Sequence, residues 1–293
     1  MKIFKKMLTL TLMIALVASI TGCGNLQLSS SNQSALQKAK DEGVVTIGFA
    51  NEKPYAYKEN GKVTGEAVEV AKAVFKKLGI KKVKPVLTDF GSLIPGLKAG
   101  RFDVITAGMY ITPERCKEVA FANPEYSIGE SLAVKKGNPK NLHSYEDVAK
   151  NPQVKIGVMK GAIEESYMKD AGVKESQIII VPDQPSAVAA LEAGRVDGIT
   201  MTGPSLRAVL DSAKAEGVEE VKDFKQPKVD GKEVRGYGAA AFRVEDKDFQ
   251  KAFTKELEKM KDSGELYKTL KPFGFTKEDL PGDYTAEELC KKQ

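Results

Sequence analysis

Two ten-residue stretches of this chain match each other, and they constrain its architecture more than any other feature. Residues 97–106 and 191–200 are identical at seven of ten positions. Each stretch reads as a helix that ends at a glycine, a tight turn that contains an aspartate, and a strand. At the same offset, Asp89 matches Asp183. The repeat predicts two similar α/β lobes, and a chance match within one α/β sheet is the alternative.

Strand-like and helix-like patterns alternate from Gly43 onward. Short runs rich in β-branched residues occupy positions 44–48, 83–87 and 104–107. Between the first two runs, residues 66–78 carry apolar side chains at helical spacing. Because strands that alternate with helices form parallel βαβ units, we expect an α/β fold.

Two further strand-like runs, residues 131–134 and 238–242, are expected to cross between the lobes. Two strands between two lobes make a hinge, and a hinge allows a cleft to close over a ligand. The boundaries that follow are residues 43–133 and 238–293 for the first lobe, 138–234 for the second lobe, and 134–137 and 235–237 for the hinge region.

The first 22 residues read as a bacterial export signal. Three lysines precede an apolar run at residues 7–20, which is shorter than the about 20 residues of a membrane span. Residues 20–23, Ile-Thr-Gly-Cys, resemble a lipobox, in which Cys23 is lipidated and becomes the mature N-terminus. An ordinary signal peptide with an incidental cysteine is the alternative. Residues 23–42 are then the lipidated cysteine and a flexible tether, and the protein is extracytoplasmic and lipid-anchored to the membrane.

Composition excludes several kinds of chemistry. The single histidine, His143, and the lack of a Cys-x-x-Cys motif argue against multi-histidine zinc sites and thioredoxin-like redox sites, so no metal or cofactor is expected. Without the signal's three lysines, 42 basic residues face 40 acidic ones, and this net charge of +2 does not indicate nucleic-acid binding. Outside the cytosol, Cys116 and Cys290 form either a disulfide or two buried free thiols.

A family resemblance rests on residues 107–115, which read Ala-Gly-Met-Tyr-Ile-Thr-Pro-Glu-Arg. Gly-Arg-Phe-Asp precedes this segment at residues 100–103, and Val-Ala-Phe follows it at residues 119–121. The combination resembles the solute-binding proteins of ABC importers, best the polar amino-acid-type branch, over residues 43–275. The resemblance implies a periplasmic-binding-protein-like fold with type II topology, two α/β lobes on a two-strand hinge. It also implies a monomeric receptor, not an enzyme, that passes a small solute to a membrane permease.

The Thr-Pro-Glu-Arg motif carries its own chemistry. Thr112 is suited to cap a helix whose first residue is Pro113. Arg115 then lies in the first turn, where the helix dipole and the guanidinium both favour an anion. Arginine binds carboxylates in a bidentate manner. In relatives of this branch, the arginine at this position holds the solute's carboxylate.

The chain departs from α-amino-acid binders at three places. Thr202 stands where an aspartate usually contacts the ligand's ammonium, and residues 161–163, Gly-Ala-Ile, lack the usual hydroxyl groups. Residues 65–69 read Gly-Glu-Ala-Val-Glu where the branch has Gly-Phe-Asp-x-Asp. A buried α-ammonium would therefore lack partners, at a cost on the order of several kcal/mol.

Aromatic residues take the place of these groups. Tyr55, Phe90 and Tyr110, with Glu52 and Arg115, suit a ligand with a delocalised positive charge and a carboxylate, since each cation–π contact contributes roughly 0.5–2 kcal/mol. This constellation resembles ectoine/hydroxyectoine-binding proteins, whose zwitterionic ligand has an amidinium ring. The resemblance implies that Glu52 takes the ring N–H groups, the aromatic residues enclose the ring and Arg115 holds the carboxylate. It assigns closure from the second lobe to Gly161, Ala162, Ile163 and Thr202.

Two other functions remain open. One is a polar or cationic amino-acid-binding protein of the same family. The other is a lyase of the cyclohexadienyl dehydratase type, which shares the scaffold and would need Glu52 or Glu66 as a general acid. The lipobox argues against the lyase, because a tether helps a receptor to feed a permease.

Overall fold

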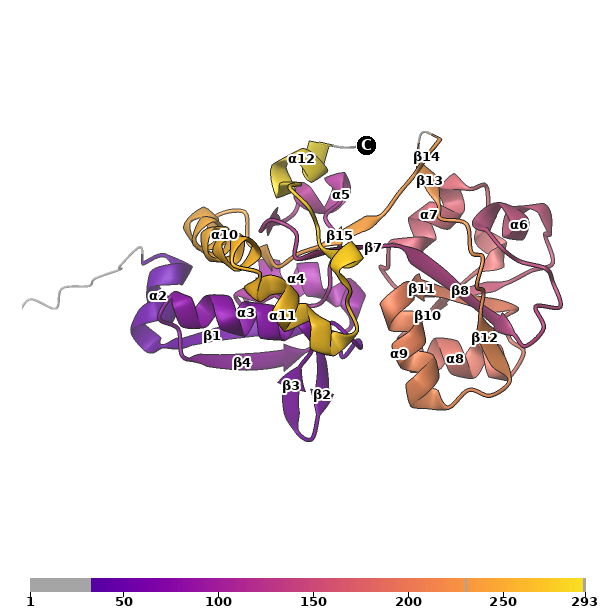
Figure 1. The fold of residues 1–293 in the computed structure, drawn as a ribbon, viewed down its shortest axis with the longest axis horizontal. Helices are drawn as coiled ribbons and strands as arrows, with labels where there is room; N and C mark the ends of the chain where they lie inside the picture. The colour runs from indigo at the N-terminus through magenta and orange to yellow at the C-terminus, as the bar shows by residue number, and fades with distance from the viewer. Residues whose placement is uncertain (1–32, 230, 292–293) are drawn as a thin grey trace, which may run out of the picture. The chain divides into compact units, whose positions relative to one another are not determined.

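The structure, a computed structural model, describes residues 33–229 and 231–291. Cys23 and the export signal at residues 1–22 lie outside the described residues, and their roles remain predictions. The described residues from Ser34 onward belong to one compact unit with two α/β lobes (Figure 1). None of the helices described in it is long and apolar enough to span a membrane.

The first lobe is built on a five-stranded mixed sheet. Strand β1 runs parallel to β4 and β5, whereas β16 runs antiparallel to β5 and β6. In spatial order the strands are β4 (Lys82–Leu87), β1 (Val44–Phe49), β5 (Val104–Ile105), β16 (Ala241–Phe242) and β6 (Ala120–Phe121), and a hairpin of β2 (Tyr57–Glu59) and β3 (Lys62–Thr64) extends the lobe.

Short and long helices accompany this sheet. They are α2 (Ala35–Glu42), α3 (Glu66–Lys77), α4 (Leu93–Lys98), α5 (Pro113–Cys116), α10 (Lys247–Asp262), α11 (Glu265–Leu270) and α12 (Ala286–Lys291), with 3₁₀ turns η1 (Phe90–Ser92), η3 (Lys271–Phe273) and η4 (Lys277–Asp279). The apolar faces of α3 and α10 meet through Phe75, which packs against Phe249 and Phe253. The disulfide Cys116–Cys290 joins α5 to α12.

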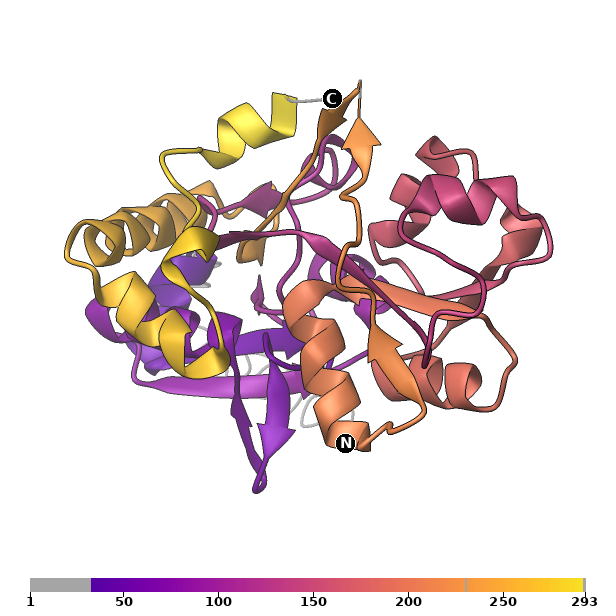
Figure 2. The same cartoon turned by 45° about the vertical axis from the view of Figure 1, so that its right-hand side comes forward.

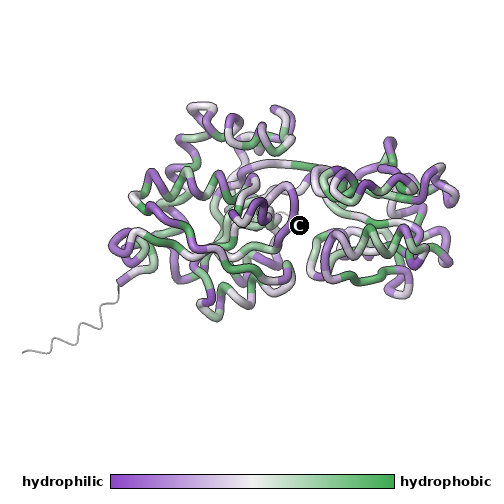
Figure 3. The backbone as a smooth tube through the Cα atoms, turned by 90° about the horizontal axis from the view of Figure 1, so that it is seen from below, coloured by the Kyte–Doolittle hydropathy of each residue, from purple (hydrophilic) through white to green (hydrophobic). Residues whose placement is uncertain are grey.

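The second lobe repeats the same sheet. Its strands, in spatial order, are β10 (Ile178–Val181), β9 (Ile156–Met159), β11 (Gly198–Thr202), β8 (Glu130–Lys135) and β12 (Val218–Glu220). As in the first lobe, three parallel strands in the order second, first, third are followed by one antiparallel strand. The accompanying elements are α6 (Tyr145–Lys150), α7 (Glu164–Asp170), η2 (Glu175–Gln177), α8 (Gln184–Glu192), α9 (Gly203–Ala213), and the hairpin β13 (Lys228–Val229) and β14 (Lys232–Glu233). Figure 3 shows hydrophobic chain running through the middle of this lobe.

The internal repeat has the same structural role in both lobes. The carboxylate of Asp103 accepts a hydrogen bond of 3.0 Å from the Thr46 backbone, and that of Asp197 accepts one of 2.9 Å from the Lys155 backbone. Gly100 ends α4, and its counterpart Gly194 follows α8, with φ of 69° and 68°, a conformation that favours glycine. Each aspartate thus connects the third strand of its sheet to the first, and the prediction of two similar α/β lobes is confirmed.

One of the two predicted hinge segments differs from the structure. Residues 131–134 lie inside β8, a central strand of the second sheet, and residues 241–242 form β16 of the first sheet. The strands that pair between the lobes are instead β7 (Tyr126–Ile128) and β15 (Gly236–Gly238), which are antiparallel. Figures 1 and 2 show the two crossings side by side. An apolar run shows that a strand is buried but not to which sheet it belongs, and therefore the first hinge segment, residues 134–137, was placed too late in the chain. The second predicted segment, residues 235–237, overlaps β15.

Part of the segment predicted to be a flexible tether is helical. Residues 35–42, which the sequence assigned to the tether, form α2. Ser34 is the N-cap of this helix, and its side chain accepts a hydrogen bond from the Gln37 backbone. Ala39 on this helix is buried in the core of the first lobe. A helix this short is stable because of such packing, and the polar composition of the segment concealed it.

Candidate ligand-binding site

Arg115 occupies the position that the sequence predicts. Thr112 accepts a hydrogen bond of 3.2 Å from the Arg115 backbone, so it caps the short helix that begins at Pro113. The guanidinium of Arg115 donates to the carbonyl of Tyr110 at 2.9 Å and to that of Gly161 in the second lobe at 3.0 Å. Because both acceptors are backbone carbonyls, the guanidinium has no carboxylate partner in these two bonds.

Tyr55 connects the lobes through its hydroxyl group. Its ring stacks on Tyr126 with centroids 5.4 Å apart and meets the edge of Phe275. Its hydroxyl shares a hydrogen bond of 2.6 Å with Thr202 at the end of β11. Gly108 lies so close to the ring that a Cβ there would be 2.4 Å from it. The surroundings therefore fix the ring of Tyr55 in one position.

Glu52 also connects the lobes. Its backbone forms two hydrogen bonds with that of Ala56, which holds the loop after β1 in place. Its Oε1 accepts hydrogen bonds from Gln184 at 2.7 Å and from Ser205 at 3.2 Å, both in the second lobe. Burial and the nearby carboxylate of Glu164 raise the pKa of Glu52 to about 8.

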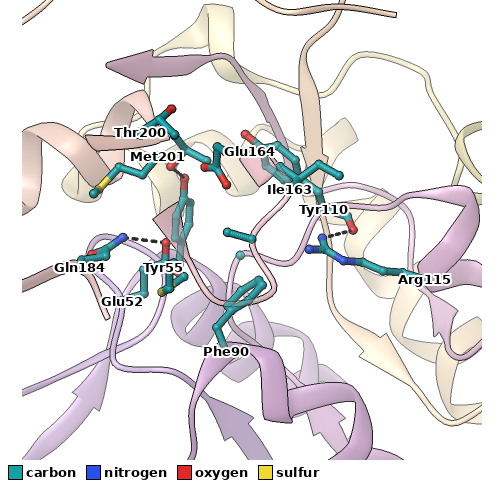
Figure 4. Close-up of a pocket in the computed structure, with 14 residues that line it drawn as sticks. Glu52, Tyr55, Phe90, Tyr110, Arg115, Ile163, Glu164, Gln184, Thr200 and Met201 are labelled. Carbon is teal, nitrogen blue, oxygen red and sulfur yellow. Dashed lines mark hydrogen bonds between the residues drawn. The ribbon is translucent and has the colours of Figure 1, made fainter. Parts of the chain in front are cut away.

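These contacts enclose a cavity between the lobes (Figure 4). The cavity has a volume of about 30 Å³, which is enough for about two water molecules. The guanidinium carbon of Arg115 lies 5.6 Å from the ring centroid of Phe90. The lining residues are Glu52, Tyr55, Phe90, Gly108, Tyr110, Arg115, Met159, Ala162, Ile163, Glu164, Gln184, Thr200, Met201 and Thr202.

Of the nine residues that the sequence assigns to the solute site, eight line this cavity. Gly161 is the exception, since it does not line the cavity but contributes the carbonyl that Arg115 contacts. With φ of 78°, it also approaches Gly91 of the first lobe so closely that a Cβ would be 2.9 Å from the Gly91 Cα. Gly161 therefore belongs to the contact between the lobes.

Several lining residues were missed, and the internal repeat could have found some of them. Gln184 lies 94 residues after Phe90, and Thr202 lies 94 residues after Gly108, the same offset as in the repeat. Equivalent loops of the two lobes thus contribute equivalent positions to the cavity. Glu164 follows directly after Ile163, but no sequence signal indicated that its side chain would be buried.

Two acids proposed from sequence for the lyase alternative are separated by the fold. Glu52 lines the cavity, whereas Glu66 is fully buried at the start of α3 and is not among the lining residues. Burial and contact with Glu125 raise the pKa of Glu66 well above its usual value. A general acid at Glu66 would not reach a solute in this cavity.

Two α/β lobes that close over a small cavity define a solute-binding protein of the two-lobed type. The family model of the bacterial extracellular solute-binding proteins, family 3, matches residues 45–276. The chain belongs to this family, and the resemblance drawn from the Thr-Pro-Glu-Arg motif is confirmed.

Relatives of known description are similar over nearly their whole length. A probable amino-acid ABC transporter periplasmic-binding protein of Sinorhizobium fredii is 39% identical, over 94% of this chain and 92% of that protein. The arginine-binding extracellular protein ArtP of Bacillus subtilis is 32% identical, over 94% and 99%. The crystal structure of EhuB in complex with hydroxyectoine has a TM-score of 0.81 and 39% identity, covering 88% of this chain and 98% of EhuB.

Proposed function

We propose that this chain is the solute receptor of an ABC importer and that its solute is ectoine or hydroxyectoine. The first part is supported by membership of the extracellular solute-binding family and by the amino-acid ABC transporter protein of Sinorhizobium fredii. The receptor would close over its solute outside the cytoplasm and deliver it to a permease.

One observation supports the choice of solute: three aromatic rings, a guanidinium and a carboxyl group surround the same cavity. Tyr55, Phe90 and Tyr110 come from three loops of the first lobe, and all of them line the cavity with Arg115 and Glu52. Aromatic faces favour a delocalised cation, and arginine favours a carboxylate. Ectoine has both groups on one small ring, and the similarity to EhuB supports the same conclusion.

Binding would exchange contacts between the lobes for contacts to the solute. The cavity of about 30 Å³ is too small for a ring of this size, so the lobes have to separate slightly around it. The solute carboxylate would replace the carbonyl of Gly161 on Arg115. The ring N–H groups would be held by Glu52, while Ala162, Ile163 and Thr202 enclose the solute from the second lobe.

A cationic amino acid is the second candidate, and the charges of the site favour it. Three buried carboxyl groups, Glu52, Glu130 and Glu164, lie at or near the cavity with Arg115. An additional cation on the solute would balance them. The similarity to ArtP, which is described as arginine-binding, supports this candidate.

The same proposal has three further parts. Cys23 is lipidated, the receptor is a monomer, and its lobes rotate about β7 and β15. A lipid on Cys23 would keep the receptor near its permease. The antiparallel pair β7–β15 is a suitable hinge because it connects two sheets that share no strand.

The experiment that tests the proposal is a calorimetric titration of the mature chain with a panel of solutes. Ectoine, hydroxyectoine, glycine betaine, L-arginine, L-histidine and L-glutamine are compared under identical conditions. We expect the two ectoines to bind most tightly and to raise the melting temperature. Tighter binding of arginine, histidine or glutamine would replace the ectoine assignment by the amino-acid one.

A further inference from the structure

Two carboxyl groups of the second lobe meet next to the cavity. Glu130 is the first residue of β8, and Glu164 is the first residue of α7. Their side chains are buried, with relative exposures of 4% and 3%, and the two carboxyl groups are close enough to act on each other's pKa. Glu164 lines the cavity, as Figure 4 shows, whereas Glu130 is not among the lining residues. The pair therefore connects the solute cavity to the interior of the second lobe.

The surroundings do not neutralise this pair. Within the part of the chain that the structure describes, both oxygens of Glu130 and Oε2 of Glu164 lack a donor in strict hydrogen-bonding geometry. The hydroxyl of Tyr110 lies near Glu130 and lowers the pKa of its carboxyl group, but less than burial raises it. The backbone N–H of Thr202 faces Glu164, and the guanidinium of Arg115 attracts its charge. The other titratable groups that act on the two carboxyls are Glu52, Tyr110, Tyr145 and Tyr167. Among the groups that act on the pair, Arg115 is the one positive charge, and it also attracts the charge of Glu52.

Two carboxylates in contact within a buried site cannot both be ionised without a large cost, and such pairs retain a proton between them. Burial raises the pKa of Glu130 and of Glu164, and the nearby Glu164 carboxylate raises that of Glu130 further. The proton has a structural role as well, because it makes one carboxyl group a hydrogen-bond donor to the other.

We propose that Glu130 and Glu164 share one proton in the closed cleft, and that the positive group of a bound solute displaces it. Glu130 is a positioning residue, which acts on the solute through Glu164. The inference rests on the proposed function only in assuming that the solute carries a cation, which holds for ectoines and for arginine. The proton on the pair leaves to the solvent, and the solute cation takes over its neutralising role.

Proton release makes affinity depend on pH. If binding releases one proton, the association constant rises about tenfold for each pH unit over the range in which the pair holds its proton. Glu130→Gln replaces the acid by an amide of similar shape, whose N–H₂ group can donate to Glu164. Glu164 is then ionised before the solute arrives, and binding releases no proton from the pair.

The test is titration calorimetry with hydroxyectoine and, separately, with L-arginine, in buffers of different ionisation enthalpy. The dependence of the binding heat on the buffer gives the number of protons released. For the unmodified protein we expect a release near one proton at about pH 7 and an affinity that rises between about pH 6 and about pH 8. For Glu130→Gln we expect a release near zero and a flat affinity profile.

Glu165→Gln is the matched control, because Glu165 is the next residue on α7 and pairs with Lys169 at the surface. It should behave like the unmodified protein. Hydroxyectoine binding with the same proton count in the unmodified protein and in Glu130→Gln overturns the inference and leaves the proposed function intact. Release that depends on Glu130 with arginine, without any binding of hydroxyectoine, supports the inference and overturns the ectoine assignment.

A measurement without solute decides the matter if neither compound binds. Because the folded pair holds a proton that the unfolded chain loses above about pH 5, stability in urea should fall with rising pH. Glu130→Gln should reduce this slope by the equivalent of up to about one proton, and Glu165→Gln should not. Equal slopes for all three proteins would overturn the shared proton.

Discussion

The hydroxyl groups of Tyr55 and Thr202 lie 2.6 Å apart, although 147 residues separate them in the chain. Tyr55 belongs to the loop after the first strand of the first lobe, and Thr202 ends the third strand of the second lobe. Neither lobe can turn away from the other without breaking this bond. The end of β11 therefore contributes a hydroxyl that contacts the aromatic wall of the cavity.

Removing this hydroxyl should weaken solute binding. Thr202→Val keeps the shape of the side chain but leaves the buried Tyr55 hydroxyl without its partner, at a cost of about 1–3 kcal/mol in the closed state. We expect an affinity for hydroxyectoine about tenfold lower, mostly through faster dissociation, as measured by stopped-flow fluorescence. Ser212→Ala, which removes an exposed hydroxyl on α9, is the control. Unchanged dissociation in Thr202→Val would show that this bond does not hold the cleft closed.

Arg115 should determine whether a carboxylate is recognised at all. Arg115→Ala removes the donors that now contact Tyr110 and Gly161, and a solute carboxylate would remain unpaired in the cavity. We expect a loss of affinity of at least about 30-fold, equivalent to about 2 kcal/mol or more. Arg115→Lys should restore little, because lysine lacks the planar bidentate geometry.

Circular dichroism and the melting temperature should show that Arg115→Ala is folded. Arg207→Ala is a suitable control, since Arg207 makes an exposed ion pair with Glu220 away from the cavity. Calorimetry that gives the same affinity for Arg115→Ala as for Arg207→Ala would place the carboxylate elsewhere.

Much of the fold and part of the site could be predicted from sequence, for a physical reason. The repeat encodes a local structure, a helix end, an aspartate turn and a strand, and Asp103 and Asp197 make the same bond in both lobes. The position of Arg115 in a first helical turn could be predicted because helix capping is also local: Thr112 and Pro113 define the helix start within three residues. Its role toward a carboxylate was taken from the family resemblance. Such short-range interactions are visible in the order of residues.

The features that were missed depend on long-range contacts. The pattern of β8 shows a buried strand, but its pairing with β11 is a property of the folded sheet. Glu130 is a charged residue in sequence, and only the fold shows that it is buried against Glu164. Gln184 was overlooked although the repeat relates it to Phe90, because an amide beside a turn aspartate has no distinctive pattern of its own.

The disulfide between Cys116 and Cys290 should contribute measurably to stability. Cys116 is the residue after Arg115, and the bond connects α5 to α12 across a sequence separation of 174 residues. Closing so long a loop restricts the unfolded chain, and the loss of a disulfide typically costs about 2–5 kcal/mol. We expect Cys116→Ser with Cys290→Ser to unfold at lower urea concentration. A reducing agent should destabilise the unmodified protein but not the double variant, and equal sensitivity of the two would contradict the bond.

A second carboxyl pair predicts how stability depends on pH. Glu66 and Glu125 are in contact in the first lobe, with relative exposures of 0% and 1%. Burial raises the pKa of Glu125 to about 8, and the backbone N–H of Ala240 donates to it at 3.2 Å. Ala240 lies just after β15 and Glu125 just before β7, so the pair is located where β7 and β15 join the first lobe.

Replacing Glu66 by glutamine should make the protein less sensitive to alkaline pH. In the folded protein the pair retains a proton that the unfolded chain loses near the ordinary pKa of 4.5. Its contribution to stability is therefore complete below about pH 4.5 and declines as the pH rises toward about 8, the pKa of Glu125. The decline amounts to at most about 1.4 kcal/mol per pH unit for one proton.

Glu66→Gln keeps a hydrogen-bond donor at every pH, so its urea midpoint should vary less between about pH 5 and about pH 8. The exposed Glu192→Gln serves as the control, and a pH profile of Glu66→Gln that is as steep as that of the control would show that the pair holds no proton.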